Sequence, residues 1–134
     1  MIALDTSLVV AAFATWHEAH ADAAALLARR PRLPSHVLIE TYSVLTRLPP
    51  PHRAPAGIVE GFLEASFSGP PLALPGNAHR SLVRLAVEAG LTGGAIYDAL
   101  VAATAKRAKA TLLTRDRRAL VAYEAVGVRY ELLG

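Results

Sequence analysis

The sequence predicts an α/β domain in which helices cover both faces of a mostly parallel sheet. Two observations support this class. Short apolar segments that suit buried strands alternate along the chain with longer segments of helical periodicity. The 134 residues suit one compact domain over 1–134, without a repeat, a low-complexity tract or a clear linker.

The N-terminal segments begin this alternation. Met1–Leu4 is short and apolar, which predicts a strand. Thr6–Ala14 is predicted to be a helix, with Asp5 or Thr6 as its cap, because both side chains can accept hydrogen bonds from free amides at a helix start. The Ala- and Leu-rich segment His17–Arg30 predicts a second helix that ends in a basic cluster, and Arg32–Pro34 a very short strand.

The middle of the chain continues with two helices and a strand. Apolar residues of His36–Leu48 recur at helical spacing, and Ser35 precedes them as a cap. The proline-rich segment Leu48–His52 predicts a rigid loop, because residues before proline avoid the helical region. Ala54–Phe67 is expected to be helical, and Pro71–Leu74 to be a strand.

The C-terminal half repeats the pattern, with a turn at Gly90–Gly94. The expected helices and strands, in chain order, are Gly76–Glu88 (helix), Ala95–Lys109 (helix), Thr111–Thr114 (buried strand), Arg117–Tyr123 (short helix) and Val128–Leu132 (strand). In sheets of this kind the ligand site lies at the carboxyl ends of the strands. Asp5 and Asp116 both follow a predicted strand and therefore lie where chemistry is expected.

Composition narrows the class of protein. Hydrophobic residues make up 53% and charged residues 19%, so either the core is large or apolar surface meets a partner, for which a homodimer is the simplest explanation. No apolar run approaches the roughly 18 residues of a spanning helix. No basic leader precedes Asp5, so a secretory signal is not expected. The absence of cysteine excludes disulfides and thiolate chemistry, and a cytoplasmic setting fits.

The net charge of +3 is modest, but its distribution matters. If four acids form one site, only seven of the 11 acidic residues remain elsewhere, against 14 lysines and arginines. Such a surface attracts a polyanion electrostatically.

Three acidic residues stand in segments without other charges. Asp5 is the only charged side chain before Glu18. Glu40 is alone between Arg32 and Arg47, and Asp98 is alone between Glu88 and Lys106. An unpaired buried carboxylate costs several kcal/mol, so each needs a basic partner, a raised pKa or a bound cation. A divalent ion such as Mg²⁺ or Mn²⁺ prefers oxygen ligands and would serve all three.

Each acid also has a structural explanation. Asp5 and Asp116 can cap the helices that follow them, and Asp116 is flanked by arginines. Asp98 lies in a first helical turn, where the helix dipole favours negative charge. Glu40 can pair with His36, four residues earlier. Only the joint placement of the four acids favours a functional site.

Four motifs in order resemble PIN domains and cover nearly the whole chain. They are Ile-Ala-Leu-Asp-Thr-Ser at 2–7, Val-Leu-Ile-Glu-Thr-Tyr at 37–42, Ile-Tyr-Asp-Ala at 96–99 and Thr-Leu-Leu-Thr-Arg-Asp at 111–116. In size and style the chain looks like the VapC toxins of bacterial toxin–antitoxin pairs. The resemblance implies an α/β/α sandwich and an Mg²⁺- or Mn²⁺-dependent endoribonuclease, the toxin of a type II system, that cuts tRNA or rRNA. It also implies a homodimer and a VapB-type antitoxin.

The resemblance carries over residue by residue. Asp5, Glu40, Asp98 and Asp116 match the family's acids, Thr6 its polar residue after the first acid, and Thr114 its hydroxyl near the last. Arg117 and Arg118 stand where some PIN domains have a further acid, which weakens the expectation of a second metal ion.

Our hypothesis is that Asp5 and Asp98 ligate the principal metal ion, directly or through water. Glu40 and Asp116 would complete the shell, hold waters or bind a second ion, and Thr6 and Thr114 would orient carboxylates or waters.

Basic and aromatic residues give weaker indications. The candidates for phosphate contacts are Arg29, Arg30, Arg32, Arg115, Arg117 and Arg118, although a solvated charged surface explains each of them equally well. Trp16 is a candidate for stacking on bases, or else packs in the core or a dimer. His17 and His20 are expected to be surface residues, since no third metal ligand accompanies them.

Three alternatives stay open. The chain could be another PIN nuclease, acting in RNA processing or on DNA flaps. It could be a Mg²⁺-binding receiver-like or nucleotide-binding domain without catalysis, although no glycine-rich phosphate loop follows the first strand. It could also be a protein-binding module.

Overall fold

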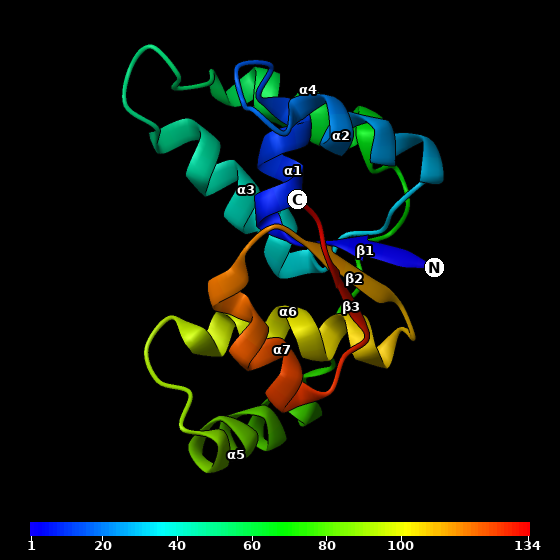
Figure 1. Ribbon diagram of the computed structural model, residues 1–134, viewed down its shortest axis with the longest axis vertical. Coiled ribbons are helices and arrows are strands. Elements are labelled where there is room, and N and C mark those ends of the chain that lie inside the picture. The colour runs from blue at the N-terminus through cyan, green and yellow to red at the C-terminus, as the bar shows by residue number, and fades with distance from the viewer.

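The computed structural model describes residues 1–134, and at its centre lies a parallel sheet of three strands (Figure 1). The strands are β1 (Ile2–Leu4), β2 (Thr111–Thr114) and β3 (Tyr130–Leu132), in the order β1–β2–β3. Ala3 pairs with Leu112, which in turn pairs with Tyr130. The central strand β2 is almost entirely buried, as expected for a sheet covered on both faces.

Two single bridges extend the sheet beyond β1. Ala3 pairs with Arg32, and Pro34 pairs with Leu72, both in parallel. The predicted strands Arg32–Pro34 and Pro71–Leu74 are therefore reduced to isolated bridges. Prolines explain the difference, because they lack the amide hydrogen that a longer ladder needs.

Helices form a layer on each side of the sheet, as Figure 1 shows. On one side lie α1 (Thr6–Phe13), α2 (His20–Ala25), α3 (Ser35–Arg47) and α4 (Ala56–Ser66). On the other side lie α5 (His79–Ala89), α6 (Ala95–Arg107) and α7 (Leu120–Val126). Helices α3 and α6 contact each other across the end of the sheet. The predicted α/β/α architecture is confirmed.

Short 3₁₀ turns account for most differences from the predicted helix bounds. They are η1 (Leu26–Arg29), η2 (Gly76–Ala78) and η3 (Arg117–Ala119). The predicted helix at 117–123 therefore consists of η3 followed by α7, which continues to Val126. Ser35 is the first residue of α3 rather than its cap, because Pro34 holds the extended conformation before it.

The second predicted helix starts three residues late. The side-chain nitrogen Nδ1 of His17 accepts a hydrogen bond from the amide of Ala19 at 3.0 Å, which closes a turn before α2 begins at His20. His20 donates from Nδ1 to the carbonyl of Ala11 at 2.9 Å. Both histidines lie at the surface but are partly buried, and each hydrogen-bonds to a backbone group.

Small side chains let α6 approach the sheet closely. Ala99, Ala102 and Ala105 recur every three residues and are completely buried, while Leu112 and Leu113 of β2 are completely buried as well. Interiors packed to this density leave no room for extra methylenes. No helix of the structure has the length and apolarity that crossing a membrane requires. Large apolar side chains also remain on the surface, including Ile39, Ile58, Val83 and Val87.

Candidate active site

Asp5 lies at the carboxyl end of β1, where its amide donates the last ladder bond to the carbonyl of Leu113 at 3.2 Å. Its side chain caps α1 by accepting from the amide of Leu8 at 3.4 Å, as the capping explanation predicted. The same carboxylate also accepts hydrogen bonds from three hydroxyl groups. Ser7 donates to Oδ1 at 2.5 Å, and Tyr123 donates to Oδ2 at 2.9 Å. Thr114 donates to Oδ2 as well.

Burial explains why Asp5 needs these partners. Only 5% of the residue is exposed. Burial raises the pKa of Asp5 above its ordinary value, while the hydroxyl groups of Ser7, Thr114 and Tyr123 act in the opposite direction. Burial likewise raises the pKa of the Tyr123 phenol, and the adjacent Asp5 carboxylate adds to this, so Tyr123 stays a proton donor. Asp5 is therefore held by donors on both oxygens.

Thr114 joins two of the predicted acids. Its hydroxyl donates to Asp5 and accepts from the amide of Asp116 at 2.9 Å. Asp116 also caps η3 by accepting from the amide of Arg118 at 3.0 Å, and the Arg118 guanidinium stays 4.0 Å away. The fully buried Thr114 thus fixes the end of β2 against the end of β1.

Glu40 enters the same region from the middle of α3. Thr6, directly after the first acid, donates its hydroxyl to Oε1 of Glu40. On its other oxygen Glu40 faces His36, with 3.9 Å between Nε2 and Oε2. This distance exceeds a hydrogen bond, and Nε2 of His36 is buried without a hydrogen-bond partner. Thr6 is therefore the closest fixed contact of Glu40.

Asp98 is close enough to the other three acids for their charges to act on it. It lies in the first turn of α6 and is half-buried. The pKa of Asp98 is raised from 3.8 to about 6, first by burial and then by the carboxylates of Asp116, Glu40 and Asp5, in that order. Arg118 is the only cation that opposes this rise appreciably. Four acids from four separate segments of the chain therefore share one neighbourhood with little positive charge.

The chemistry of the four acids fits a hard divalent cation, because they offer carboxylate oxygens and an excess of negative charge. As the side chains stand, however, no group of three His, Cys, Asp or Glu residues lies close enough to hold a metal ion. The oxygens of Asp5 also have protein donors already. A cation bound here would need to draw Asp98, Asp116 and Glu40 inward.

The arginines after β2 differ in their surroundings. Arg117 and Arg118 are exposed on η3 beside Asp116. Arg115 instead turns toward α2, where its guanidinium lies 3.5 Å from Glu18, while its backbone amide donates to Ser7 at 3.0 Å. The remaining candidates are Arg29 and Arg30, both exposed, and Arg32, whose guanidinium donates to the carbonyl of Pro70.

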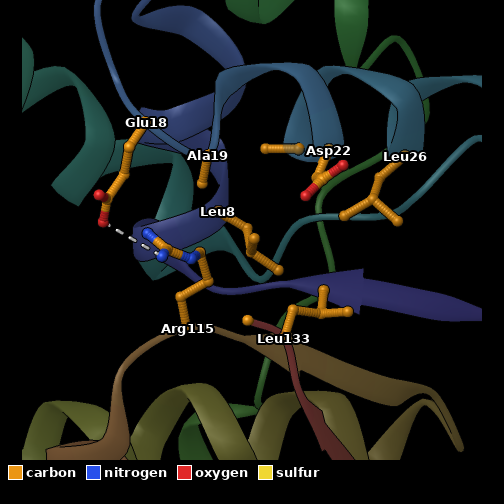
Figure 2. A pocket seen from close by; sticks show the side chains of 9 residues that line it. Leu8, Glu18, Ala19, Asp22, Leu26, Arg115 and Leu133 are labelled. Atoms are coloured by element: carbon orange, nitrogen blue, oxygen red, sulfur yellow. Dashed lines mark hydrogen bonds and ion pairs between the residues drawn. The ribbon is translucent and has the colours of Figure 1, made fainter.

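A pocket of about 370 Å³ lies between α1, α2 and the C-terminal segment (Figure 2). Leu8 forms part of its wall, and Arg115 reaches across toward Glu18. None of the four predicted acids lines this pocket. It is therefore separate from the carboxylate cluster, although Ser7 connects the Arg115 amide to Asp5.

Sequence reasoning missed two residues of the site. Ser7 and Tyr123 both donate to Asp5, yet neither was singled out. Ser7 follows Asp5 by two residues, a spacing at which a hydroxyl can reach back. Tyr123 is far away in sequence, and its only signal was a polar atom within an apolar helix.

We predict that Asp98→Asn stabilises the metal-free protein at neutral pH. Because folding raises the pKa of Asp98 to about 6, the folded chain binds more protons than the unfolded chain between about pH 4 and 6. Stability therefore falls as pH rises through that window, and the loss persists above it. Solvent screening at this half-exposed group reduces the effect to on the order of 1 kcal/mol.

Urea denaturation in EDTA at pH 4.5 and 7.5 measures this effect. Asp98→Asn should lose less stability between the two pH values than the wild type does. Identical pH dependence of the two proteins would show that the surroundings of Asp98 do not destabilise its charged form.

The fold agrees with the comparisons to known proteins. The PIN domain family profile matches residues 2–125. The chain belongs to the PIN-domain family, which confirms the resemblance seen in the four motifs.

Its similarity to named relatives covers almost the full chain. Proteins named ribonuclease VapC40 from Mycobacterium tuberculosis strains CDC 1551 / Oshkosh and H37Rv are each 52% identical to it over 133 residues, or 99% of both chains. Ribonuclease VapC27 from strain H37Rv is 42% identical over 128 residues, which are 95% of this chain and 93% of that protein.

Proposed function

We propose that this protein is a metal-dependent endoribonuclease of the VapC type, with Asp5, Glu40, Asp98 and Asp116 as its catalytic acids. The observation that carries the proposal is the convergence on Asp98 of three carboxylates from other segments, which raise its pKa together with burial. Such crowding of like charges is unfavourable in a purely structural site and marks functional ones. Family membership and the names of the relatives support the choice of RNA as substrate.

Asp5 and Asp98 would hold a Mg²⁺ or Mn²⁺ ion, directly or through water, and Glu40 and Asp116 would complete its shell. When bound, such an ion lowers the pKa of a water molecule and neutralises charge on a phosphate group. The protein's part is to fix the acids. Asp5 is oriented by its hydroxyl donors and Glu40 by its contact with Thr6 before metal and substrate arrive.

The exposed Arg117 and Arg118 would attract RNA phosphates to the edge of the acidic cluster. Because Arg115 is turned toward Glu18, we expect it to contribute less to substrate contacts.

The proposal extends to partners. From the resemblance to VapC toxins we propose that the substrate is a structured RNA of the tRNA or rRNA class, and that a VapB-type antitoxin inhibits the enzyme in a type II toxin–antitoxin pair. The names of the relatives support the ribonuclease activity. The exposed apolar side chains supply surface for such a partner or for a homodimer.

Metal removal tests the proposed function. We expect purified protein to cut a structured RNA with Mg²⁺ or Mn²⁺ and to lose cleavage entirely in EDTA, with recovery when metal is restored. Gel analysis of a labelled tRNA and a labelled DNA flap measures both substrates side by side. Cleavage of the flap alone would favour another kind of PIN nuclease, and no cleavage of either would favour a domain without catalysis.

A further inference from the structure

Aromatic side chains are scarce in this protein, at 6% of the residues, and many of them pack inside. Phe13 packs edge-on against Phe62 with 5.2 Å between ring centroids, and Tyr123 is buried beside Asp5. Three large aromatic side chains remain substantially exposed: Trp16 (50%), Tyr42 (44%) and Tyr97 (54%). Of these three, only Tyr97 is adjacent in sequence to one of the four acids.

Tyr97 is held in a defined orientation. The ring of His36 from α3 stacks against it, with 5.2 Å between centroids and 3° between the ring planes. This offset parallel arrangement is favourable for aromatic pairs. His36 in turn lies 3.9 Å from Glu40. The pair therefore bridges α3 and α6 at the border of the acidic cluster.

The pair leaves a flat apolar surface open beside the acids. His36 covers part of the Tyr97 ring, yet more than half of the residue remains exposed. Arg117 and Arg118 lie next to Asp116, on a different segment of the same cluster, and the Arg118 side chain is 98% exposed. The cluster is thus flanked by an aromatic surface on one segment and by exposed cations on another. Bases and phosphates of one RNA strand match these two kinds of surface.

We propose that Tyr97, backed by His36, is the stacking platform for one nucleobase beside the phosphate that is cut. The inference rests on the proposed function and adds a substrate preference to it. A base stacked on Tyr97 cannot remain stacked in a double helix, so the nucleotide at the platform must be unpaired. Because every base has an aromatic face, the platform selects unpaired nucleotides rather than a particular sequence.

The test combines a side-chain change with a change in the RNA. Fluorescence anisotropy measures binding of labelled single-stranded RNA 12-mers in EDTA, so that metal-dependent cleavage cannot occur. Tyr97→Leu should weaken binding about five- to a hundredfold, the range for one stacked base, whereas Tyr97→Phe should bind like the wild type. The matched control Tyr42→Leu removes another exposed tyrosine and should change nothing.

A scan of abasic nucleotides along the 12-mer localises the effect. At one position, removal of the base should weaken wild-type binding, and Tyr97→Leu should then cause no further loss. The proposal would be overturned if Tyr97→Leu reduced the RNA affinity equally at every abasic position, or if it did not reduce the affinity at all. A changed oligomeric state of Tyr97→Leu in sedimentation would also overturn it, because a second copy of the chain would then cover this face.

An assay of metal-dependent cleavage distinguishes failure of the Tyr97 platform from failure of the proposed nuclease function. Wild-type protein that cuts RNA while Tyr97→Leu binds normally contradicts only the platform. Wild-type protein that neither binds nor cuts RNA contradicts the proposed function and the platform with it.

Discussion

Asp98→Asn should reduce the rate of RNA cleavage by a factor of about 1,000 or more without disturbing the fold. Asp98 is the acid whose surroundings contain the other three, and the substitution removes its charge at nearly constant shape. Loss of a charged metal ligand forfeits several kcal/mol of transition-state stabilisation, and each 1.4 kcal/mol is about tenfold in rate. Since asparagine has nearly the same shape as aspartate, the amide fits this half-buried position without a steric conflict.

Initial rates on a labelled RNA with Mn²⁺ measure this loss. The matched control is Asp22→Asn, the same chemical change at an exposed position of α2, which should retain the wild-type rate. Expression of both variants in bacteria, with growth curves and sequencing of RNA 5′ ends, extends the comparison to cells. If wild type and Asp98→Asn arrest growth equally, catalysis at these acids does not cause toxicity.

Thr114→Val should lower both the stability and the activity of the protein, because it removes one buried hydroxyl group. The substitution keeps the shape of a completely buried residue but removes the donor to Asp5 and the acceptor for the Asp116 amide. The Asp116 amide loses its partner and Asp5 loses one of its hydroxyl donors, which together cost about 1–3 kcal/mol. The orientation of both acids depends on Thr114, so cleavage should fall about ten- to a hundredfold.

Two control variants test whether the effect depends on the hydroxyl group and on its place at residue 114. Thr114→Ser retains the hydroxyl and should recover most of the activity. Thr104→Val removes another buried threonine hydroxyl, one that only donates to the carbonyl of Leu100 at 2.7 Å within α6, and should leave the rate unchanged. Thermal denaturation and initial rates report both quantities. Equal rates for wild type and Thr114→Val would show that Thr114 supports the fold alone.

The α/β/α fold could be predicted from the sequence because its helices and strands each show a pattern within a short segment of the chain. Helical periodicity marked α3, and uninterrupted apolar residues marked β1 and β2. The strands at Arg32–Pro34 and Pro71–Leu74 were overestimated, since apolar character does not reveal how many ladder bonds prolines remove. The late start of α2 depends on the ring of His17, a side-chain contact without a periodic signal.

The sequence indicated which acids form the candidate site, but it did not indicate which residues would hydrogen-bond to them. Isolation from charged neighbours singled out Asp5, Glu40 and Asp98, and the structure places them near one another and near Asp116. Isolation from other charges predicted a basic partner, a raised pKa or a bound cation for Asp5, and burial does raise the pKa of Asp5. In the structure its compensation comes largely from neutral hydroxyl groups, among them Ser7 and Tyr123. Such donors leave no charge pattern in a sequence, and Tyr123 lies far from Asp5 in the chain and meets it only in the folded structure.

A calorimetric titration of Mn²⁺ into metal-free wild type, Asp98→Asn and Asp22→Asn tests whether the four acids form one metal centre. If Asp5, Glu40, Asp98 and Asp116 form one metal centre, the wild type and Asp22→Asn should bind Mn²⁺ alike. Asp98→Asn should bind it at least about tenfold more weakly. Equal affinity of wild type and Asp98→Asn, or no binding by the wild type, would contradict the assignment of a metal-dependent nuclease to these four acids.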